Sequence, residues 1–389
     1  MSIIIFGDTI SFPEGNAATN RVHTYAKGFV ENDINVHVIC FANDYQDDLD
    51  GIINKIRYYH PYGQTKRNNY FLIRRWFKFV KYINVIRLLK EINKNDKILI
   101  INVWTESLLT HIFTFILAKI FKTKIILERS ENPLRDTNTN YLSQINGYLK
   151  VTFEKKWYDG IICISRYLID FYKIRGADPK KLFLIPSTVD PDRFISTGEK
   201  LLQFKYIGYF GSLTFERDNL DLLIKAFKEI VTLHPDIHLL LGGFCSDASR
   251  NQIKKLVAEL NIENKVHLLQ YLSRTEIINY ISNSEILIMV RKNDLKAQAS
   301  YPSKLTEYLT TSVPVITVKV GEIEDYLSDG INVFMVEPEN CDALIDKIDF
   351  VLNNYELAKS IAIKGKELTN TVFNYNFQAK RLIEKFNSL

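Results

Sequence analysis

The sequence has few cysteines, glycines and prolines, and each shortage argues against a class of protein. Its 389 residues include 4 cysteines, 16 glycines and 10 prolines. The cysteines lie far apart and never form a Cys-x-x-Cys pair, which disfavours a disulfide scaffold and a zinc cage and favours a reducing compartment. So little glycine and proline excludes collagen-like and low-complexity chains.

Long hydrophobic runs are also missing. The longest apolar stretch, 108–121, contains His111 and Lys119 and is shorter than the roughly 20 residues that span a bilayer. The opening residues, MSIIIFG, lack the basic start and the long apolar run of a secretory signal. We therefore expect a cytoplasmic protein, with the inner face of a membrane as one location within that compartment.

What the chain does contain is a globular composition, 46% hydrophobic and 24% charged, at a length that suggests two domains of roughly 150 residues or more. Short, apolar, β-branched segments alternate with segments of helical periodicity, which predicts two doubly wound, Rossmann-like parallel sheets in an α/β fold. The expected strands are 2–6, 35–41, 97–103, 124–128, 160–164, 182–185, 205–211, 237–243, 265–269, 285–290, 313–318 and 332–336.

The segment 185–200 lacks hydrophobic periodicity and contains two prolines, which favours a linker between the domains. We therefore expect an N-terminal domain over 1–185 and a C-terminal domain over 186–365. The remaining segment, 366–389, is expected to be helical and could pack back on the N-terminal domain.

Positive charge is concentrated in one segment. Residues 64–90 contain eight Lys or Arg and no Asp or Glu. Within it, a predicted helix places Trp76 close to the basic residues Arg74, Arg75, Lys78 and Lys81. Such a helix either lies on an anionic membrane surface near a lipid-linked acceptor or packs on the core with a solvated basic face, and the sequence leaves both open.

Two loops that follow predicted strands could approach an anion. Gly15 and Asn16 precede a helix, whose N-terminus favours negative charge. Gly211 ends a strand, and Arg217 follows six residues later, before an amphipathic helix. Glycine lets a backbone approach a phosphate closely, and arginine can neutralise it. Each loop could equally be an ordinary connection with a solvated side chain.

A third loop has the densest set of polar groups. A predicted buried strand ends at Arg291, and Ser303, Lys304 and Glu307 then fall on one face of a predicted helix. Basic groups at this place suit a phosphate, and the carboxylate suits a ribose diol. A capped helix with one internal ion pair is the alternative.

These segments resemble glycosyltransferase family 4, whose members are retaining enzymes of the GT-B fold. The resemblance rests on ICISRYLIDFYKIRGADPKKLFLIPSTVDPDRF, FGSLTFERDNLDLLIKAF and YPSKLTEYLTTSVPVI, which occur in the family's order. It implies two Rossmann-like domains that face a cleft. It also implies a donor-binding set: Gly15, Asn16, Gly211, Ser212, Arg217, Arg291, Tyr301, Pro302, Ser303, Lys304 and Glu307.

Two positions depart from the family pattern. Ser212 stands where many members have an arginine, and Ala299 stands where the family has the first glutamate of its E-x(7)-E pair. The second glutamate of that pair is matched by Glu307. Contacts to the diphosphate and to the sugar hydroxyls are therefore expected to differ from those of the family.

On the N-terminal side, KIILERSENPLRD ends a strand where relatives place a polar residue beside the donor sugar and the acceptor. The candidates are Glu128, Arg129 and Glu131, of which Glu131 is favoured, although it could instead cap the following turn. The resulting catalytic set is Glu131, Arg217 and Lys304.

The resemblance implies transfer of a hexose-type sugar from a nucleoside diphosphate sugar, with retention, to a glycan or lipid-linked acceptor in surface-polysaccharide assembly. It implies no cofactor and no metal, and we expect no nucleic-acid partner. The two Asp-x-Asp tripeptides, at 48–50 and 190–192, are read as solvated. A nucleotide-sugar epimerase of the same architecture and a non-catalytic nucleotide-sugar-binding scaffold are the alternatives.

Overall fold

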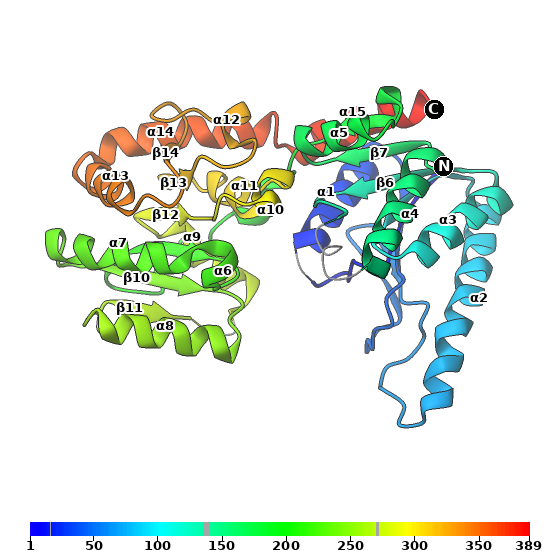
Figure 1. Ribbon diagram of the computed structural model, residues 1–389, viewed down its shortest axis with the longest axis horizontal. Helices are drawn as coiled ribbons and strands as arrows, with labels where there is room; N and C mark the ends of the chain where they lie inside the picture. Colours follow the sequence, from blue (N-terminus) through cyan, green and yellow to red (C-terminus); the bar gives the residue numbers. More distant parts are fainter. Residues whose placement is uncertain (16, 135–140, 270–271) are drawn as a thin grey trace. The chain divides into compact units, whose positions relative to one another are not determined.

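The computed structural model describes residues 1–15, 17–134, 141–269 and 272–389, and they form two compact units (Figure 1). Unit 1 comprises residues 1–188 and 375–389, and unit 2 comprises residues 189–374. The chain thus leaves unit 1 at residue 188 and returns to it at residue 375. Each unit is described by itself below.

Unit 1 is built on an eight-stranded sheet with the order β3-β4-β2-β1-β5-β6-β7-β8. Its neighbouring strands are parallel except for the antiparallel pair β3–β4. The strands are β1 (Ser2–Gly7), β2 (Asn35–Cys40), β3 (Asp50–Ile53), β4 (Ile56–Tyr59), β5 (Ile98–Trp104), β6 (Lys124–Arg129), β7 (Gly160–Cys163) and β8 (Leu182–Leu184).

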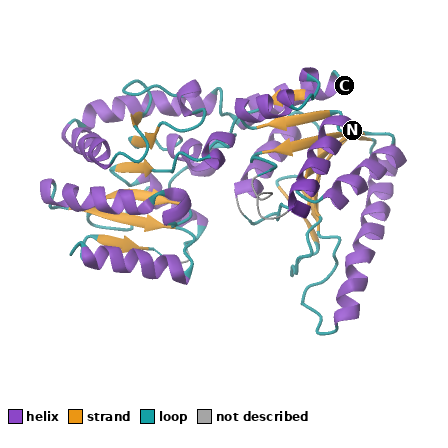
Figure 2. Ribbon diagram, viewed as in Figure 1, coloured by secondary structure: helices purple, strands orange, loops and turns teal. Residues whose placement is uncertain are grey.

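The helices of unit 1 flank this sheet (Figure 2). They are α1 (Ala17–Glu31), α2 (Phe71–Asn95), α3 (Leu108–Phe121), α4 (Tyr141–Trp157), α5 (Arg166–Ile174) and α15 (Tyr375–Asn387), with the 3₁₀ turn η2 (Pro179–Lys181). The 3₁₀ turn η3 (Pro191–Phe194) belongs to unit 2. Ring contacts join three of the unit 1 helices in sequence order: Tyr82 of α2 lies 4.7 Å from Phe113 of α3, and Phe115 of α3 lies 5.2 Å from Trp157 of α4, measured between ring centroids.

The C-terminal helix α15 packs on α1. The Tyr375 hydroxyl donates to both carboxylate oxygens of Glu31 at 2.7 Å. A Cβ on Gly28 would lie 2.5 Å from the Cβ of Ala379, so α1 needs a glycine where α15 crosses it. The last helix of the chain is therefore part of unit 1.

Unit 2 contains a six-stranded parallel sheet with the order β11-β10-β9-β12-β13-β14. Its strands are β9 (Lys205–Phe210), β10 (Ile237–Gly242), β11 (Val266–Leu268), β12 (Ile286–Met289), β13 (Val315–Val318) and β14 (Phe334–Val336). Its helices are α6 (Phe215–Asp218), α7 (Leu220–Leu233), α8 (Asp247–Glu259), α9 (Arg274–Ser282), α10 (Leu295–Ala299), α11 (Ser303–Leu309), α12 (Ile323–Tyr326), α13 (Cys341–Asn353) and α14 (Tyr355–Glu367), with the 3₁₀ turn η4 (Leu368–Asn370).

The predicted fold class, two doubly wound parallel sheets, is confirmed. Strands form at all twelve expected places, and the central ones are wholly buried because apolar side chains alternate to both faces of the sheet. The β3–β4 hairpin was not predicted. Its strands are short, and Asn54 and Lys55 in its turn have positive φ angles. The turn contains neither Gly nor Pro, the residues that usually indicate a turn in a sequence.

Among the described residues, no helix combines the length and the apolar character needed to cross a bilayer.

Candidate functional site

In unit 2, the loops that follow β9 and β10 pack backbone against backbone. The Gly211 amide donates to the Gly242 carbonyl oxygen at 2.9 Å. Gly243 has a φ of +122°, and a Cβ there would lie 2.2 Å from the Gly211 carbonyl oxygen, so only glycine fits. A Cβ on Gly211 itself would lie 2.6 Å from the Lys304 Nζ. The lysine ammonium thus rests directly on the loop at the carboxyl end of β9.

Lys304, near the start of α11, is held by two side chains of other elements. Its Nζ donates to the Tyr209 hydroxyl at 2.6 Å and to Asp218 Oδ1 at 3.0 Å. Burial lowers the pKa of Lys304, because it disfavours the charged form, and the Asp218 carboxylate opposes that effect. Tyr209 from β9 and Asp218 from α6 therefore orient the ammonium.

Two arginines add positive charge beside this lysine. Arg291 follows β12, is buried, and its Nη2 donates to Ser300 Oγ at 2.8 Å. Burial lowers the pKa of Arg291, and the positive charge of Arg217 lowers it further. Arg217 is exposed in α6. The positive charge of Arg217 lowers the pKa of both Arg291 and Lys304, so the three residues form one cationic cluster, which suits a polyanionic ligand.

Glu307, one turn beyond Lys304 on α11, lies in a second charged group that the sequence did not reveal. Burial lowers the pKa of Arg193 to about 10, with Arg274 contributing, whereas Asp190 and Glu307 oppose the shift. The pKa of Arg274 is likewise lowered by burial and raised by Glu307 and Asp190. The half-buried Glu307 is therefore surrounded by charged partners drawn from η3 and α9.

The remaining donor-side candidates of unit 2 differ in accessibility. Ser212 is exposed, and Pro302 and Ser303 are half-buried at the beginning of α11. Tyr301 is buried, with its ring packed against Tyr326 and Phe373. Ala299, the residue in place of a family glutamate, is fully buried at the end of α10.

In unit 1, Gly15 lies just before α1, and Asn16 falls outside the described residues. A Cβ on Gly15 would lie 2.3 Å from Thr19 Oγ1, which itself donates to the Ser11 carbonyl oxygen. The glycine is needed here because the loop folds tightly onto the first turn of α1.

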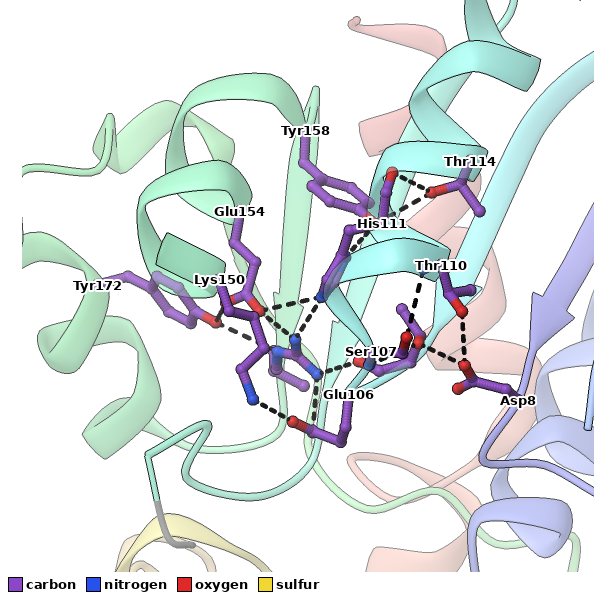
Figure 3. A network of polar contacts seen from close by, with 12 residues as sticks. Asp8, Glu106, Ser107, Thr110, His111, Thr114, Lys150, Glu154, Tyr158 and Tyr172 are labelled. Carbon is purple, nitrogen blue, oxygen red and sulfur yellow. Dashed lines mark hydrogen bonds and ion pairs between the residues drawn. The ribbon is translucent and has the colours of Figure 1, made fainter. Parts of the chain in front are cut away.

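A buried polar network lies at the carboxyl ends of β5 and β6 (Figure 3). Arg129, the last residue of β6, is buried; its guanidinium donates to Glu106 Oε1 at 2.9 Å and forms an ion pair with Glu154 of α4. Glu154 accepts a hydrogen bond from the Tyr172 hydroxyl at 2.5 Å, and its Oε1 lies 3.3 Å from His111 Nε2. These contacts join β6 to α3, α4 and α5.

The network keeps its central carboxylate ionised and presents another one to solvent. Burial alone would raise the pKa of Glu154, but the charge of Arg129 and the hydrogen bond from His111 hold it at about 2. Glu106 is 40% exposed, and Lys150 Nζ lies 2.6 Å from its Oε2. Glu106 is therefore a partly exposed carboxylate that two cations hold in place.

Two of the three acceptor-side candidates need correction. Arg129 is occupied within the network above, and Glu128 is buried in an ion pair with Arg21 of α1 at 2.8 Å. Arg21 also donates to the Ile185 and Pro186 carbonyl oxygens. Both candidate side chains stabilise the interior of unit 1 and are not accessible to an acceptor. The third candidate, Glu131, is half-buried in the loop after β6.

The basic segment places most of its predicted residues at the surface. Trp76 and Phe79 are 62% and 58% exposed, and Arg75 and Lys78 are exposed beside them. Arg74 is half-buried, and its Nη1 donates to the Asn68 carbonyl oxygen.

Lys81 was predicted on the same basic surface, and this prediction is wrong. Its Nζ donates to the Phe41 carbonyl oxygen at 2.7 Å and lies 3.9 Å from the Phe41 ring centroid. Lys81 is buried because it falls on the side of α2 that packs toward the sheet, together with Val85 and Leu89.

Sequence reasoning missed Glu106, Lys150, Glu154, Asp218 and Arg193. Lys150 and Glu154 could have been noticed, since they stand four residues apart on one face of a predicted helix that is otherwise apolar there. The others lie in loops or single helical turns, where the spacing of residues in the sequence does not indicate which charged side chains will pair. Among the described residues, no group of three or more His, Cys, Asp or Glu is placed to hold a metal ion.

Comparison with known families finds one matching model. Residues 194–368, which lie in unit 2, match the family described as "Glycosyl transferases group 1". An uncharacterized glycosyltransferase of Methanocaldococcus jannaschii is 24% identical over 211 residues, which are 54% of this chain and 54% of that relative. The match thus spans about half the length of the curated relative.

Solved structures resemble the whole chain. Sucrose-phosphate synthase from Thermosynechococcus elongatus has a TM-score of 0.75 at 17% identity, covering 100% of this chain and 98% of that one. Anabaena HepE, in complex with UDP and glucose, has a TM-score of 0.73 at 16% identity over 100% of both chains. WaaG, a glycosyltransferase involved in lipopolysaccharide biosynthesis, has a TM-score of 0.64 at 14% identity over 98% of both. The fold of this chain is GT-B.

Proposed function

We propose that this chain is a glycosyltransferase that transfers a hexose-type sugar from a nucleoside diphosphate sugar, with retention, to a glycan or lipid-linked acceptor. The observation that carries the proposal is the cationic cluster of Arg217, Arg291 and Lys304 around the Gly211 loop. It stands at the carboxyl ends of parallel strands, where α/β folds bind phosphates. It also lies within the segment that matches a glycosyltransferase family model. The GT-B relatives include one that binds UDP and glucose.

In this proposal, the cluster stabilises the charge that gathers on the leaving diphosphate, without a metal ion. Lys304 is already oriented by Tyr209 and Asp218, so it needs little reorganisation when the donor binds. Losing one such contact typically costs ~10²–10³ in rate. Glu307, which interacts with Arg193 and Arg274, binds the ribose hydroxyls of the donor.

On the acceptor side, Glu131 is the proposed catalytic residue. Glu106 joins it as a second candidate, since its carboxylate is partly exposed and is held by Arg129 and Lys150. A carboxylate fixed in this way can accept hydrogen bonds from sugar hydroxyls without first losing side-chain freedom.

The proposed acceptor belongs to surface-polysaccharide assembly, and the enzyme works at the cytoplasmic face of a membrane. The exposed pair Trp76 and Phe79 beside Arg75 and Lys78 supports this part of the proposal. Apolar side chains next to basic ones favour binding to anionic lipid surfaces.

The first experiment is a thermal-shift panel of nucleotides and nucleotide sugars. A ligand that binds only the native state stabilises it by about 2.7 kcal/mol at a hundred times its dissociation constant. We expect one nucleoside diphosphate and its sugar to raise the melting temperature. If no member of the panel does so, the proposed donor site is wrong.

The second experiment incubates the best donor with glycan and lipid-linked acceptors and follows the anomeric configuration of the product by NMR. We expect a product of retained configuration that also forms in the presence of EDTA. Appearance of an isomerised donor without any acceptor would instead identify an epimerase. In the same assay, Glu131→Gln and Glu106→Gln separate the two acceptor-side candidates. Only substitution of the residue that contacts the acceptor should change the KM for the acceptor.

A further inference from the structure

A pocket of about 450 Å³ runs along α4 in unit 1. Five of its lining residues come from α4, one from the loop after β6 and one from the end of α5. They are Leu134, Gln144, Tyr148, Val151, Thr152, Lys155 and Arg175. The volume falls within the range of ~300–1,000 Å³ typical of small-molecule sites.

The pocket separates apolar and cationic groups along its length. Lys155 and Arg175 stand together, since Lys155 Nζ donates to the Arg175 carbonyl oxygen at 2.6 Å. The Arg175 guanidinium lies 3.7 Å from the Phe171 ring centroid and donates to the Phe171 carbonyl oxygen. Gln144 lies eleven residues before Lys155, which is about 16 Å along the helix at 1.5 Å per residue.

Between those ends the lining is mostly carbon, supplied by Leu134, Tyr148 and Val151. None of the seven lining residues is acidic. The chemistry that fits is therefore a hydrocarbon chain of moderate length that carries an anionic head group. A free phosphate would leave the apolar part unused, and a neutral hydrocarbon would leave the two cations unused.

The surface of α4 around the pocket favours the same kind of ligand. Tyr141 and Leu142 are 75% and 77% exposed. The other exposed apolar side chains in the first half of α4 are Ile145, Tyr148 and Leu149. Glu154 is the acidic residue of α4, and it is buried in its ion pair with Arg129. A cluster of exposed apolar residues on a basic helix is typical of contact with lipid.

We propose that this pocket binds one anionic lipid, with the phosphate at Lys155 and Arg175 and the hydrocarbon chain along Val151 and Tyr148 toward Leu134. The site goes beyond the proposed sugar transfer, because it requires neither the donor nor the acceptor. The membrane that α2 is proposed to contact serves only as the source of this lipid.

The test uses octyl phosphate below its critical micelle concentration and the full-length protein, without nucleotide and without vesicles. Calorimetry should show one binding site. Octanol and inorganic phosphate at the same concentration should each bind about tenfold more weakly or worse, because each provides only half of the ligand. Equal heats from inorganic phosphate alone would show a plain anion site and overturn the proposal, as would no binding of octyl phosphate.

Variants then assign the binding to the pocket. Thr152→Trp fills its middle and should abolish binding; Gln144→Trp, at an exposed position, fills its outer end and serves if the first variant folds poorly. The pair Lys155→Gln and Arg175→Gln should weaken binding about tenfold. Lys156→Gln is the matched control, since Lys156 is exposed on the same helix and does not line the pocket. Wild-type binding in the folded tryptophan variants would overturn the proposal. Binding of octyl phosphate is measured without nucleotide, so its outcome is independent of the nucleotide experiments. The lipid proposal and the glycosyltransferase proposal can therefore fail separately.

Discussion

Lys304 Nζ and Asp218 Oδ1 lie 3.0 Å apart in a largely buried ion pair. The residues are 86 positions apart in the chain, and α6 and α11 bring them together beside β9. The other two members of the cationic cluster are Arg217 and Arg291. The charge available to a diphosphate is therefore set by three cations and the carboxylate that orients one of them.

Removing that carboxylate should destabilise the protein. Asp218→Asn leaves the largely buried Lys304 ammonium without its ionic partner, so we expect a loss of about 3 kcal/mol in the free energy of unfolding. Denaturant titration measures the loss. Saturating nucleoside diphosphate should restore more stability to the variant than to the wild type, because the ligand supplies negative charge. An unchanged free energy of unfolding would show that the pair contributes little.

Glu307→Ala should weaken nucleotide binding while the protein stays folded. Loss of the ribose contact is expected to lower the affinity for the best nucleoside diphosphate about tenfold. Affinity for its 2′,3′-dideoxy analogue should not change, since that analogue has no hydroxyls to bind. Glu324→Ala is the control, as Glu324 is a largely exposed carboxylate of α12. Wild-type affinity by calorimetry would remove Glu307 from the donor site.

Arg217→Ala tests the exposed cation of the cluster. We expect kcat/KM to fall about tenfold or more, which corresponds to about 1.4 kcal/mol of transition-state stabilisation. Arg217→Lys should recover much of the loss, because an ammonium can still neutralise the diphosphate. If the kinetics of the alanine variant stay within about twofold of the wild type, Arg291 and Lys304 carry the diphosphate without it.

The basic surface of α2 should bind anionic vesicles at low salt. Binding should fade as the Debye length shrinks from about 30 Å at 0.01 M to about 8 Å at 0.15 M. Replacing Arg74, Arg75 and Lys78 with Gln should abolish co-sedimentation and leave activity on a water-soluble acceptor intact; Lys81 is kept because it is buried.

The matched control for this experiment removes the same charge from the other end of α2. Arg87, Lys90 and Lys94 are exposed there, and their replacement with Gln should leave vesicle binding largely in place. Equal losses in the two triple variants would point to net charge rather than to the surface around Trp76. Failure of the wild type to co-sediment at low salt would contradict the membrane contact.

Acid should destabilise unit 1 through His37. Burial and the nearby Arg57 lower the pKa of His37 from 6.5 to about 4. Between these values the unfolded chain binds more protons than the folded one, so the free energy of unfolding falls as the pH falls from 6.5 to 4. The difference amounts to about 3 kcal/mol when complete. His37→Gln should flatten the fall, as measured by denaturant titrations from pH 7.5 to pH 4.5. Identical slopes in the two proteins would contradict this.

The sequence by itself determined the fold class and most of the secondary structure, the β3–β4 hairpin excepted. Runs such as 97–103 and 285–290 are apolar on both faces, and only a buried parallel strand satisfies such a run while pairing its backbone groups. The placement of Gly211 after β9 and of Arg291 and Lys304 after β12 also followed, since the carboxyl ends of parallel strands meet at one edge of the sheet.

Which of those polar residues are accessible was decided only by the tertiary structure. Lys81 and Arg75 look alike in a basic segment, yet one donates to the Phe41 carbonyl and the other is exposed. Glu128 is neutralised by Arg21, 107 positions earlier, and Lys304 by Asp218. Partners so distant in sequence meet through helix packing, and helix packing depends on the shape of the whole core, which no local spacing of residues records.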